Sequence, residues 1–338
     1  CTANVCTVPG CSGEWSDATA QSGAKLSHGG GIVVDAGGSV HGAWSGGGSY
    51  AKKPVGGTWS VEATGGGAWN GAFALDPSGG THVSYFDSGS NLVWVSSRAA
   101  GSTSWTQTIV GSPGAGQYQD TTSIVAEAQG GLHVRYLSQG ALKYAYRAAG
   151  ASSFATEVAA NTGYASGSTA HACNSLAVDA QGGVHIVYFA AHDSVWYAYR
   201  APGGGWSTQS LDDDASLVGA PPYLALDAQG GVHAVYLGAI SRQLRHAYKP
   251  AGGSWSKRTL VTKVEQLFSP ALAVSDFGTV HVTYQHEGTL NYLQAPPTGT
   301  SLDFYNVLAS GLKISEVARV AVDQAGGVHV LYERDNAV

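Results

Sequence analysis

The sequence predicts an all-β fold built from repeated four-stranded sheets, and three observations support this prediction. A segment that reads SLAVDAQGGVHIVY at residues 175–188 occurs in seven versions, each a strand, a Gly-rich turn and a second strand. The histidines of these versions are spaced by 41, 51, 52, 48, 48 and 48 residues, at His41, His82, His133, His185, His233, His281 and His329. Charged residues make up only 12% of the chain and glycine 48 of its 338 residues, which fits doubly covered strands joined by tight turns. Repeats of this period are typical of propeller blades, so we predict a seven-bladed β-propeller.

A repeat fold also accounts for the length of the chain. A single compact core rarely grows beyond ~250–300 residues, whereas a repeat unit buries its faces only against its neighbours. We therefore predict that residues 1–338 form one β-propeller domain.

Each blade is predicted to contain four antiparallel strands. In the fourth copy the inner strand is 176–179, the second 184–189, the third 195–200 and the outer 206–211. The apolar runs are short and alternate weakly, as expected for strands that are covered on both faces. The outer strand of every copy opens with an aromatic residue: Trp15, Trp59, Trp105, Phe154, Trp206, Trp255 and Phe304.

The order of these segments predicts how the ring closes. Trp15 precedes the first inner hairpin, while the last hairpin, in residues 317–332, has no third or outer strand after it. Residues 3–19 would therefore supply the third and outer strands of a closing blade whose inner strands are residues 317–332. A blade shared between the N- and C-terminal segments removes two exposed sheet edges.

Charge and hydropathy argue against two classes of partner. The net charge is −6, and the 17 Lys and Arg residues are scattered without a basic patch, so we do not expect nucleic-acid binding. No apolar run approaches the ~20 residues that a membrane-spanning helix needs.

The start of the sequence indicates export. The chain contains no Met and begins with Cys1, which resembles the mature start of a bacterial lipoprotein after signal removal. We expect an extracellular, periplasmic or outer-surface location, with Cys1 either free or a lipid-anchor site. A Cys6–Cys11 disulfide would suit such an oxidising compartment, and Cys173 would remain a thiol.

The seven repeat histidines are predicted to hold the blades together. A residue that recurs in every blade is explained by blade geometry, so each imidazole should hydrogen-bond within or between blades, with the turn Asp or a backbone group as its partner. The sixth copy reads Ser275-Asp276-Phe277-Gly278, with its Asp displaced by one position. An Asp–His pair is therefore not obligatory in that copy.

A ligand site is predicted at the mouth of the central channel, on the face of the loops that join the blades. These loops vary in length and composition, whereas the turns on the opposite face are short and uniform. Residues that begin the inner strands should ring this mouth, and their mixture of aromatic and polar side chains suits a glycan or a surface protein. The candidate ligand-binding residues are His28, Trp69, Tyr118, Asp120, His171, Phe268 and Glu316.

Two segments contain residue types that ligate metals. In His171-x-Cys173 both side chains would point to one side of an extended strand, and together with His28 they are candidate zinc or copper ligands. The Asp212–Asp214 run is a candidate calcium site. No second cluster with ligand spacing supports either site, so the sequence fixes no cofactor.

The repeat A-[VL]-D-x-x-G-G-x-H-V-x-Y resembles the blades of bacterial secreted propellers of the sialidase-like, BNR-repeat kind, and of the propeller-fold ulvan lyases. The resemblance covers nearly the whole chain but consists of scaffold residues, and it implies a propeller in an extracellular carbohydrate context. Sialidase activity is not implied, because that site needs three arginines, and only Arg242 and Arg334 are expected on the variable face.

The resemblance to ulvan lyases implies an alternative function, that of a polysaccharide lyase. Such an enzyme needs a base and an acid, typically His and Tyr, and a cation on the uronate carboxylate. The candidates by residue type are His171 or His192, Tyr164 or Tyr223, and Arg242. We favour a non-catalytic, exported ligand-binding propeller, with the lyase and a metal-binding propeller as the alternatives.

Overall fold

The computed structural model describes most of the repeat region of the chain. The described residues are 15, 18–22, 30–44, 48–65, 69–114, 122–163, 175–190, 194–214, 222–238, 241–262, 268–299, 304–310 and 318–333. The elements of regular secondary structure in this part of the chain are all β-strands, so the all-β prediction is confirmed. No described segment is a helix that could span a membrane.

The described strands form six four-stranded antiparallel blades and one two-stranded sheet, each ordered from the inner strand outwards. Blades 1 to 3 are β1 (Gly31–Val34), β2 (Val40–Trp44), β3 (Ser49–Lys53) and β4 (Ser60–Ala63); β5 (Trp69–Leu75), β6 (Thr81–Asp87), β7 (Leu92–Arg98) and β8 (Thr106–Gly111); and β9 (Ser123–Ala126), β10 (Leu132–Ser138), β11 (Ala141–Arg147) and β12 (Ala155–Asn161). Blades 4 to 6 are β13 (Leu176–Val178), β14 (Val184–Ala190), β15 (Ser194–Arg200) and β16 (Trp206–Asp212); β17 (Tyr223–Leu226), β18 (Val232–Gly238), β19 (Gln243–Lys249) and β20 (Ser256–Val261); and β21 (Phe268–Val274), β22 (Val280–His286), β23 (Thr289–Ala295) and β24 (Phe304–Ser310). The two-stranded sheet consists of β25 (Ala318–Val322) and β26 (Val328–Tyr332).

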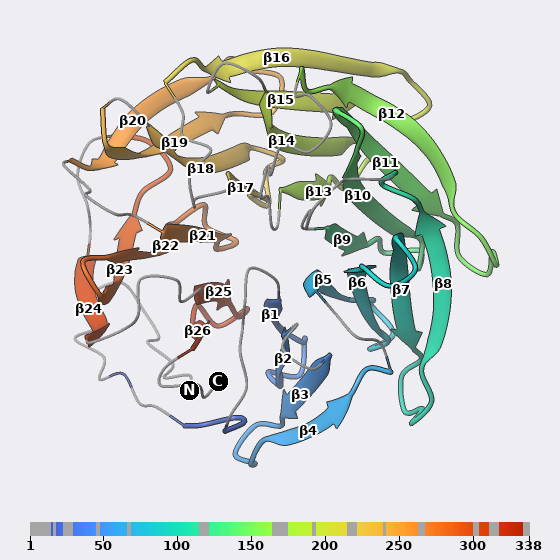
Figure 1. The fold of residues 1–338 in the computed structure, drawn as a ribbon. Helices are drawn as coiled ribbons and strands as arrows, with labels where there is room; N and C mark the ends of the chain where they lie inside the picture. The colour runs from blue at the N-terminus through green and yellow to red at the C-terminus, as the bar shows by residue number, and fades with distance from the viewer. Residues whose placement is uncertain are drawn as a thin grey trace.

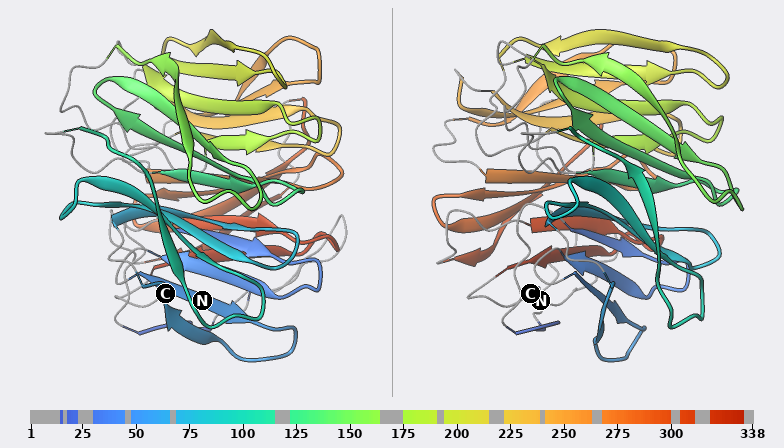
Figure 2. Two further views of the ribbon diagram at one scale, coloured as in Figure 1. Left: turned by 90° about the vertical axis from the view of Figure 1, so that its right-hand side faces the viewer. Right: turned by 45° about the vertical axis from the view of Figure 1, so that its right-hand side comes forward.

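The blades surround a central axis, with the inner strands at the centre and β4, β8, β12, β16, β20 and β24 at the periphery (Figure 1). Neighbouring sheets lie face to face, and each is turned relative to the next (Figure 2). The apolar core lies between the blades: Leu142 and Tyr144 of blade 3 pack in one cluster with Ile186 and Tyr188 of blade 4. Strands buried on both faces explain the short apolar runs of the sequence.

The prediction of seven four-stranded blades is wrong, since the described chain forms six. Within the described residues, the seventh copy of the repeat forms the two-stranded sheet β25–β26, which contacts β21 on one side and β1 on the other. The motif encodes an inner hairpin, so counting motifs counts hairpins and not complete blades. Of residues 3–19, the predicted partner strands, only Trp15, Ala18 and Thr19 are described, and none of the three belongs to a strand.

Aromatic residues at the start of the outer strands connect neighbouring blades. Trp206 packs edge-on against Tyr144 of the preceding blade, with ring centroids 5.3 Å apart. Trp255 makes the same T-shaped contact with Tyr197 at 5.2 Å. Trp15 contacts Tyr292 of blade 6 in this geometry, also at 5.3 Å. The N-terminal segment therefore makes with blade 6 the contact that an outer strand makes with the preceding blade elsewhere.

The turn between the inner and second strands is built on one carboxylate. Oδ1 of Asp179 accepts hydrogen bonds from the N–H groups of Gln181 and Gly183, at 2.9 and 2.7 Å. The backbone closes the turn further, with Gly182 N–H donating to the Asp179 carbonyl at 2.9 Å. Gly182 has φ of 86°, a conformation that a residue with a Cβ adopts only at a cost.

The Gly182→Ala variant should lower the free energy of unfolding by about 1–2 kcal/mol, because alanine is strained in the left-handed region. A Cβ at Gly182 would meet no atom within 4 Å, so the cost is that of the backbone alone. Gly205→Ala is the matched control, since that site is equally open and its φ lies outside the left-handed region. Urea titration of both variants checks this, and equal stability of the two would contradict the account.

Candidate functional site

A hydrogen-bonded chain of carboxylate, imidazole and hydroxyl crosses blade 4 beside this turn. In blade 4, Oδ2 of Asp179 lies 3.0 Å from Nε2 of His185, and Nδ1 of His185 lies 2.7 Å from the Tyr197 hydroxyl. An ionised carboxylate only accepts hydrogen bonds, so Nε2 of His185 carries the proton and Nδ1 accepts from Tyr197. The chain joins the turn, the second strand and the third strand of one sheet.

Similar hydrogen bonds of the repeat histidines recur around the propeller, which confirms their predicted structural role. Six of them contact the acidic residue at the start of the turn: His41 with Asp35, His82 with Asp76, His133 with Glu127, His185 with Asp179, His233 with Asp227 and His329 with Asp323. The other imidazole nitrogen meets a tyrosine hydroxyl in blades 1, 3, 4 and 6. Recurrence in so many blades assigns these groups to the scaffold.

Burial and hydrogen bonding set the protonation states of Asp179 and His185. Burial lowers the pKa of His185, although the hydrogen bond from its ring to Asp179 acts in the opposite direction. Burial also raises the pKa of Asp179, but hydrogen bonds from His185 and from Gly183 N–H outweigh it and hold that pKa below its usual value. At neutral pH the pair is therefore a carboxylate and a neutral imidazole.

Blades 5 and 6 differ from the carboxylate–imidazole–hydroxyl arrangement of blade 4. In blade 5 a histidine replaces the tyrosine, with Nε2 of His246 lying 3.1 Å from Nδ1 of His233, and Arg258 Nε donates to Nδ1 of His246 at 3.1 Å. In blade 6, Ser275 takes the place of the turn acid, as its displaced Asp predicts, and burial lowers the pKa of His281 to about 4.

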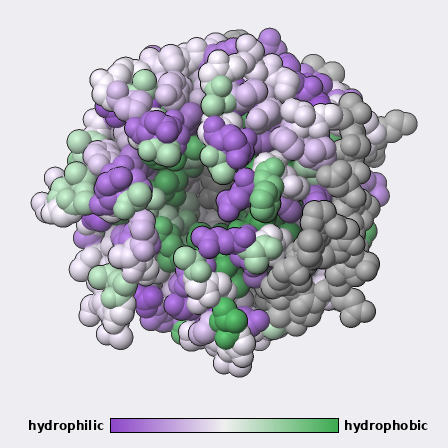
Figure 3. Space-filling model, turned by 180° about the vertical axis from the view of Figure 1, so that it is seen from behind, coloured by the Kyte–Doolittle hydropathy of each residue, from purple (hydrophilic) through white to green (hydrophobic). Residues whose placement is uncertain are grey.

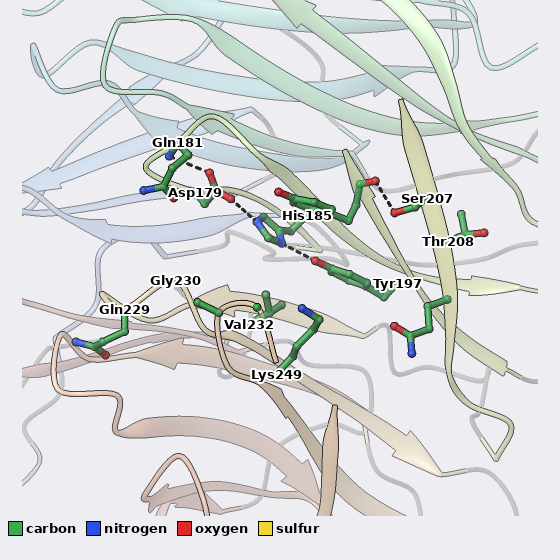
Figure 4. A pocket seen from close by; sticks show the side chains of 14 residues that line it. Asp179, Gln181, His185, Tyr197, Ser207, Thr208, Gln229, Gly230, Val232 and Lys249 are labelled. Carbon is green, nitrogen blue, oxygen red and sulfur yellow. Dashed lines mark hydrogen bonds and ion pairs between the residues drawn. The ribbon is translucent and has the colours of Figure 1, made fainter. Parts of the chain in front are cut away.

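A pocket of 760 Å³ opens between blades 4 and 5, on the face that carries the short turns. Figure 3 looks onto this face, where hydrophilic residues surround a hollow at the centre of the wheel. The pocket, here called the inter-blade groove, lies among β15, β16 and the turns of blade 5 (Figure 4). Its lining residues are Asp179, Gln181, His185, Tyr197, Tyr199, Ser207, Thr208, Gln209, Gln229, Gly230, Val232, Lys249, Ala251 and Gly252.

The inter-blade groove lies at a junction that lacks the ion pair of the preceding junction. Between blades 3 and 4, Nη1 of Arg200 lies 2.9 Å from Oε1 of Glu157, which also accepts from the Trp206 indole at 3.0 Å. In strand register, Gln209 takes the place of Glu157 and Lys249 that of Arg200.

This replacement changes how the junction is held together. Gln209 and Lys249 share no hydrogen bond or ion pair within the described chain. The buried Nε1 of Trp255, the counterpart of Trp206, has no hydrogen-bond partner among the described residues. Gln209 and Lys249, the counterparts of the two side chains that pair across the preceding junction, therefore remain available to a ligand in the inter-blade groove.

Most of the site residues predicted from the sequence lie outside the described residues. These are His28, Tyr118, Asp120, Tyr164, His171, Cys173, His192 and Glu316, and with them Cys1, Cys6 and Cys11. Trp69 and Phe268 begin the inner strands β5 and β21, as expected. Tyr223, at the start of β17, is 1% exposed and lies 5.5 Å beneath the Arg319 guanidinium. Arg242 lies in the turn before β19, with φ of 49°.

The described residues contain no group of three or more His, Cys, Asp or Glu side chains that could hold a metal ion. The predicted calcium segment instead binds a cation of the protein itself. Arg245 donates to Asp212 at 2.8 Å and to Asp214 at 2.9 Å, and the Tyr236 hydroxyl donates to Asp212 at 2.7 Å. The hydroxyl of Ser210 donates to the third carboxylate, Asp213, at 2.8 Å.

Sequence reasoning did not identify Tyr199, Gln209 and Lys249 as site residues, because it assigned function to the variable face. A usable signal is present in the sequence. The third strands of blades 3 and 4 end in Tyr-Arg, at Arg147 and Arg200, and that of blade 5 ends in Tyr-Lys, at Lys249. The change from arginine to lysine at a position that repeats along the chain marks blade 5 as different from blades 3 and 4.

The buried histidines should make the protein lose stability as pH falls below about 6.5. The folded-state pKa of His281 is lowered from 6.5 to about 4, so the unfolded chain binds a proton first and the free energy of unfolding falls across this window. For His281 alone the loss is roughly 3 kcal/mol. Ser275→Asp, which restores the turn acid, should raise the pKa of His281 and flatten the slope between pH 4 and 6.5 by up to about one proton. Urea titrations across this range measure the slope, and an unchanged slope in the variant would contradict the assignment.

Comparison with known proteins supports the fold. No protein-family model matches the chain, and no curated protein matches it. A streptogramin B lyase structure aligns with a TM-score of 0.62 and 10% identity, covering 91% of this chain and 95% of that one. The polysaccharide lyase Uly1 aligns at 0.52 and 14%, over 90% and 89%. The Aleuria aurantia lectin, in complex with Fucα1-6GlcNAc, aligns at 0.52 and 12%, over 79% and 92%. At these identities the likeness shows that the chain has a β-propeller fold.

Proposed function

We propose that this protein is a glycan-binding propeller and that the inter-blade groove is its binding site. The observation that carries the proposal is the open groove at the junction where Gln209 and Lys249 stand in place of the Glu157–Arg200 ion pair of the preceding junction. Its volume of 760 Å³ falls within the ~300–1,000 Å³ typical of small-ligand sites.

The chemistry of the groove suits a sugar. Gln209 and Gln229 offer amides that donate and accept hydrogen bonds, as sugar hydroxyls also do. Tyr199 adds a partly exposed ring, which stacks nearly parallel to Tyr197 at 6.4 Å. An aromatic wall beside uncharged polar groups is the combination that one apolar sugar face and several hydroxyls require.

The similar structures are consistent with this proposal. They include a lectin in complex with a fucosylated disaccharide and a polysaccharide lyase, so glycan binding or lyase activity fits a propeller of this kind. The His185–Tyr197 pair in the groove has the residue types of a lyase acid and base. Because equivalent pairs occur at His41, His133 and His281, however, we assign it to the scaffold and favour binding without catalysis.

The mouth of the central channel is the other location to consider. It is the site expected from His28, Trp69, Asp120 and their neighbours, and it lies on the opposite face from the groove. A test must therefore separate the two faces of one molecule.

The double variant Gln209→Glu/Lys249→Arg should abolish glycan binding, because it rebuilds across the groove the ion pair of the preceding junction. The new carboxylate would also accept from the Trp255 indole, so the free energy of unfolding should rise by about 1 kcal/mol. A glycan array identifies ligands of the wild type, and calorimetry measures their affinity for the variant.

Glu157→Gln/Arg200→Lys is the matched control, since it makes the reverse change one junction away and should leave the affinity of the inter-blade groove unchanged. Full affinity in the first double variant would place the ligand elsewhere, with the channel mouth as the remaining candidate. A wild-type protein that binds no glycan on the array would overturn the proposed function.

A further inference from the structure

Lys249 occupies a cationic position that recurs at the end of the third strand. Its counterparts in register are Lys53 of β3, Arg98 of β7, Arg147 of β11 and Arg200 of β15. The side chains of Arg98, Arg147, Arg200 and Lys249 face a described outer strand of the preceding blade. The contacts of a positively charged side chain at this position can therefore be compared at four junctions between blades.

The three arginines are all engaged by the protein. Arg98 pairs with Glu62 of β4, and its guanidinium lies 4.7 Å from the Tyr50 ring centroid. Arg147 donates to the Thr108 hydroxyl at 3.2 Å and lies 5.2 Å from the Phe154 ring. Arg200 pairs with Glu157, as described above, and lies over the Tyr144 ring at 5.7 Å.

Lys249 differs from all three. Its ammonium group makes no ion pair, hydrogen bond or ring contact with any described residue, although its side chain is partly buried in the groove wall. Figure 4 shows the side chain of Lys249 extending into the space beside Tyr197. Partial removal of an ammonium from water without a counter-ion is unfavourable, so this position favours an anion.

The acidic residue of the groove, Asp179, does not serve as that anion. The two oxygens of Asp179 already accept hydrogen bonds from Gln181 N–H, Gly183 N–H and His185. No ion pair joins Asp179 to Lys249 within 4.0 Å in the described chain. The charge of Lys249 does reach into the groove, where it acts with burial to lower the pKa of His185.

From this geometry we infer that the inter-blade groove binds an anionic sugar, with its carboxylate or sulfate group on the Lys249 ammonium and its hydroxyls on Gln209 and Tyr199. The inference rests on the proposed function and adds the class of ligand to it. Carboxylate and sulfate share the chemistry that a point-charge ammonium recognises, so the experiment must separate these two sources.

The test compares four probes that differ in charge. They are a trigalacturonate, its methyl ester, a sulfated galactan trisaccharide and the unsulfated galactan trisaccharide. Calorimetry with the full chain should show that at least one acidic probe binds about tenfold or more tightly than its neutral counterpart. The acidic probe that shows this preference identifies the natural group.

Lys249→Met keeps an unbranched side chain of similar size and removes its charge, so it should erase the preference. Arg147→Met, at the equivalent place in blade 3, should leave the preference intact. Thermal unfolding of each variant shows whether it remains folded. Neutral probes that bind as well as the acidic ones would overturn the inference and leave glycan binding standing. An acidic preference that persists in Lys249→Met would overturn it as well, and a failure of all four probes together with a silent glycan array would overturn the proposed function itself.

Discussion

The fold depends on the hydrogen-bonded chain from turn carboxylate through imidazole to hydroxyl. Sheets stacked around an axis bury nearly all of their second strands, and any polar group there must find a partner. The chain of Asp179, His185 and Tyr197 satisfies the turn amides, both imidazole nitrogens and a phenol at once. It thereby fixes the third strand against the second and presents the tyrosine ring to the tryptophan of the following blade.

We expect function in such a scaffold where one repeat differs from the others. The junctions of blades 3–4 and 4–5 share the His–Tyr chain and the edge-on tryptophan, so their walls are nearly the same. They differ in the pair of side chains that crosses the gap. A glutamate and an arginine form an ion pair across the first junction, whereas Gln209 and Lys249 form none across the second, which contains the inter-blade groove.

The local structure could be predicted from the sequence, and the blade count and the site could not. The four strands of blade 4 lie within one residue of their expected ends, because the Asp-x-x-Gly-Gly turn and the aromatic that opens the outer strand fix both hairpins. The same turn misleads at residues 318–332, where it specifies a hairpin without saying whether two more strands follow. Gln209 and Lys249 are far apart in sequence, and a register shift between Val195 and Trp196 displaces the outer strand, so their meeting is visible only in three dimensions.

The most direct test of the central claim is a crystal structure of the protein with the sugar that it binds best. The account predicts sugar density in the inter-blade groove, between β16 and the turn after β19, with an anionic group beside Lys249. Sugar density at the mouth of the central channel, with only solvent between blades 4 and 5, would contradict it.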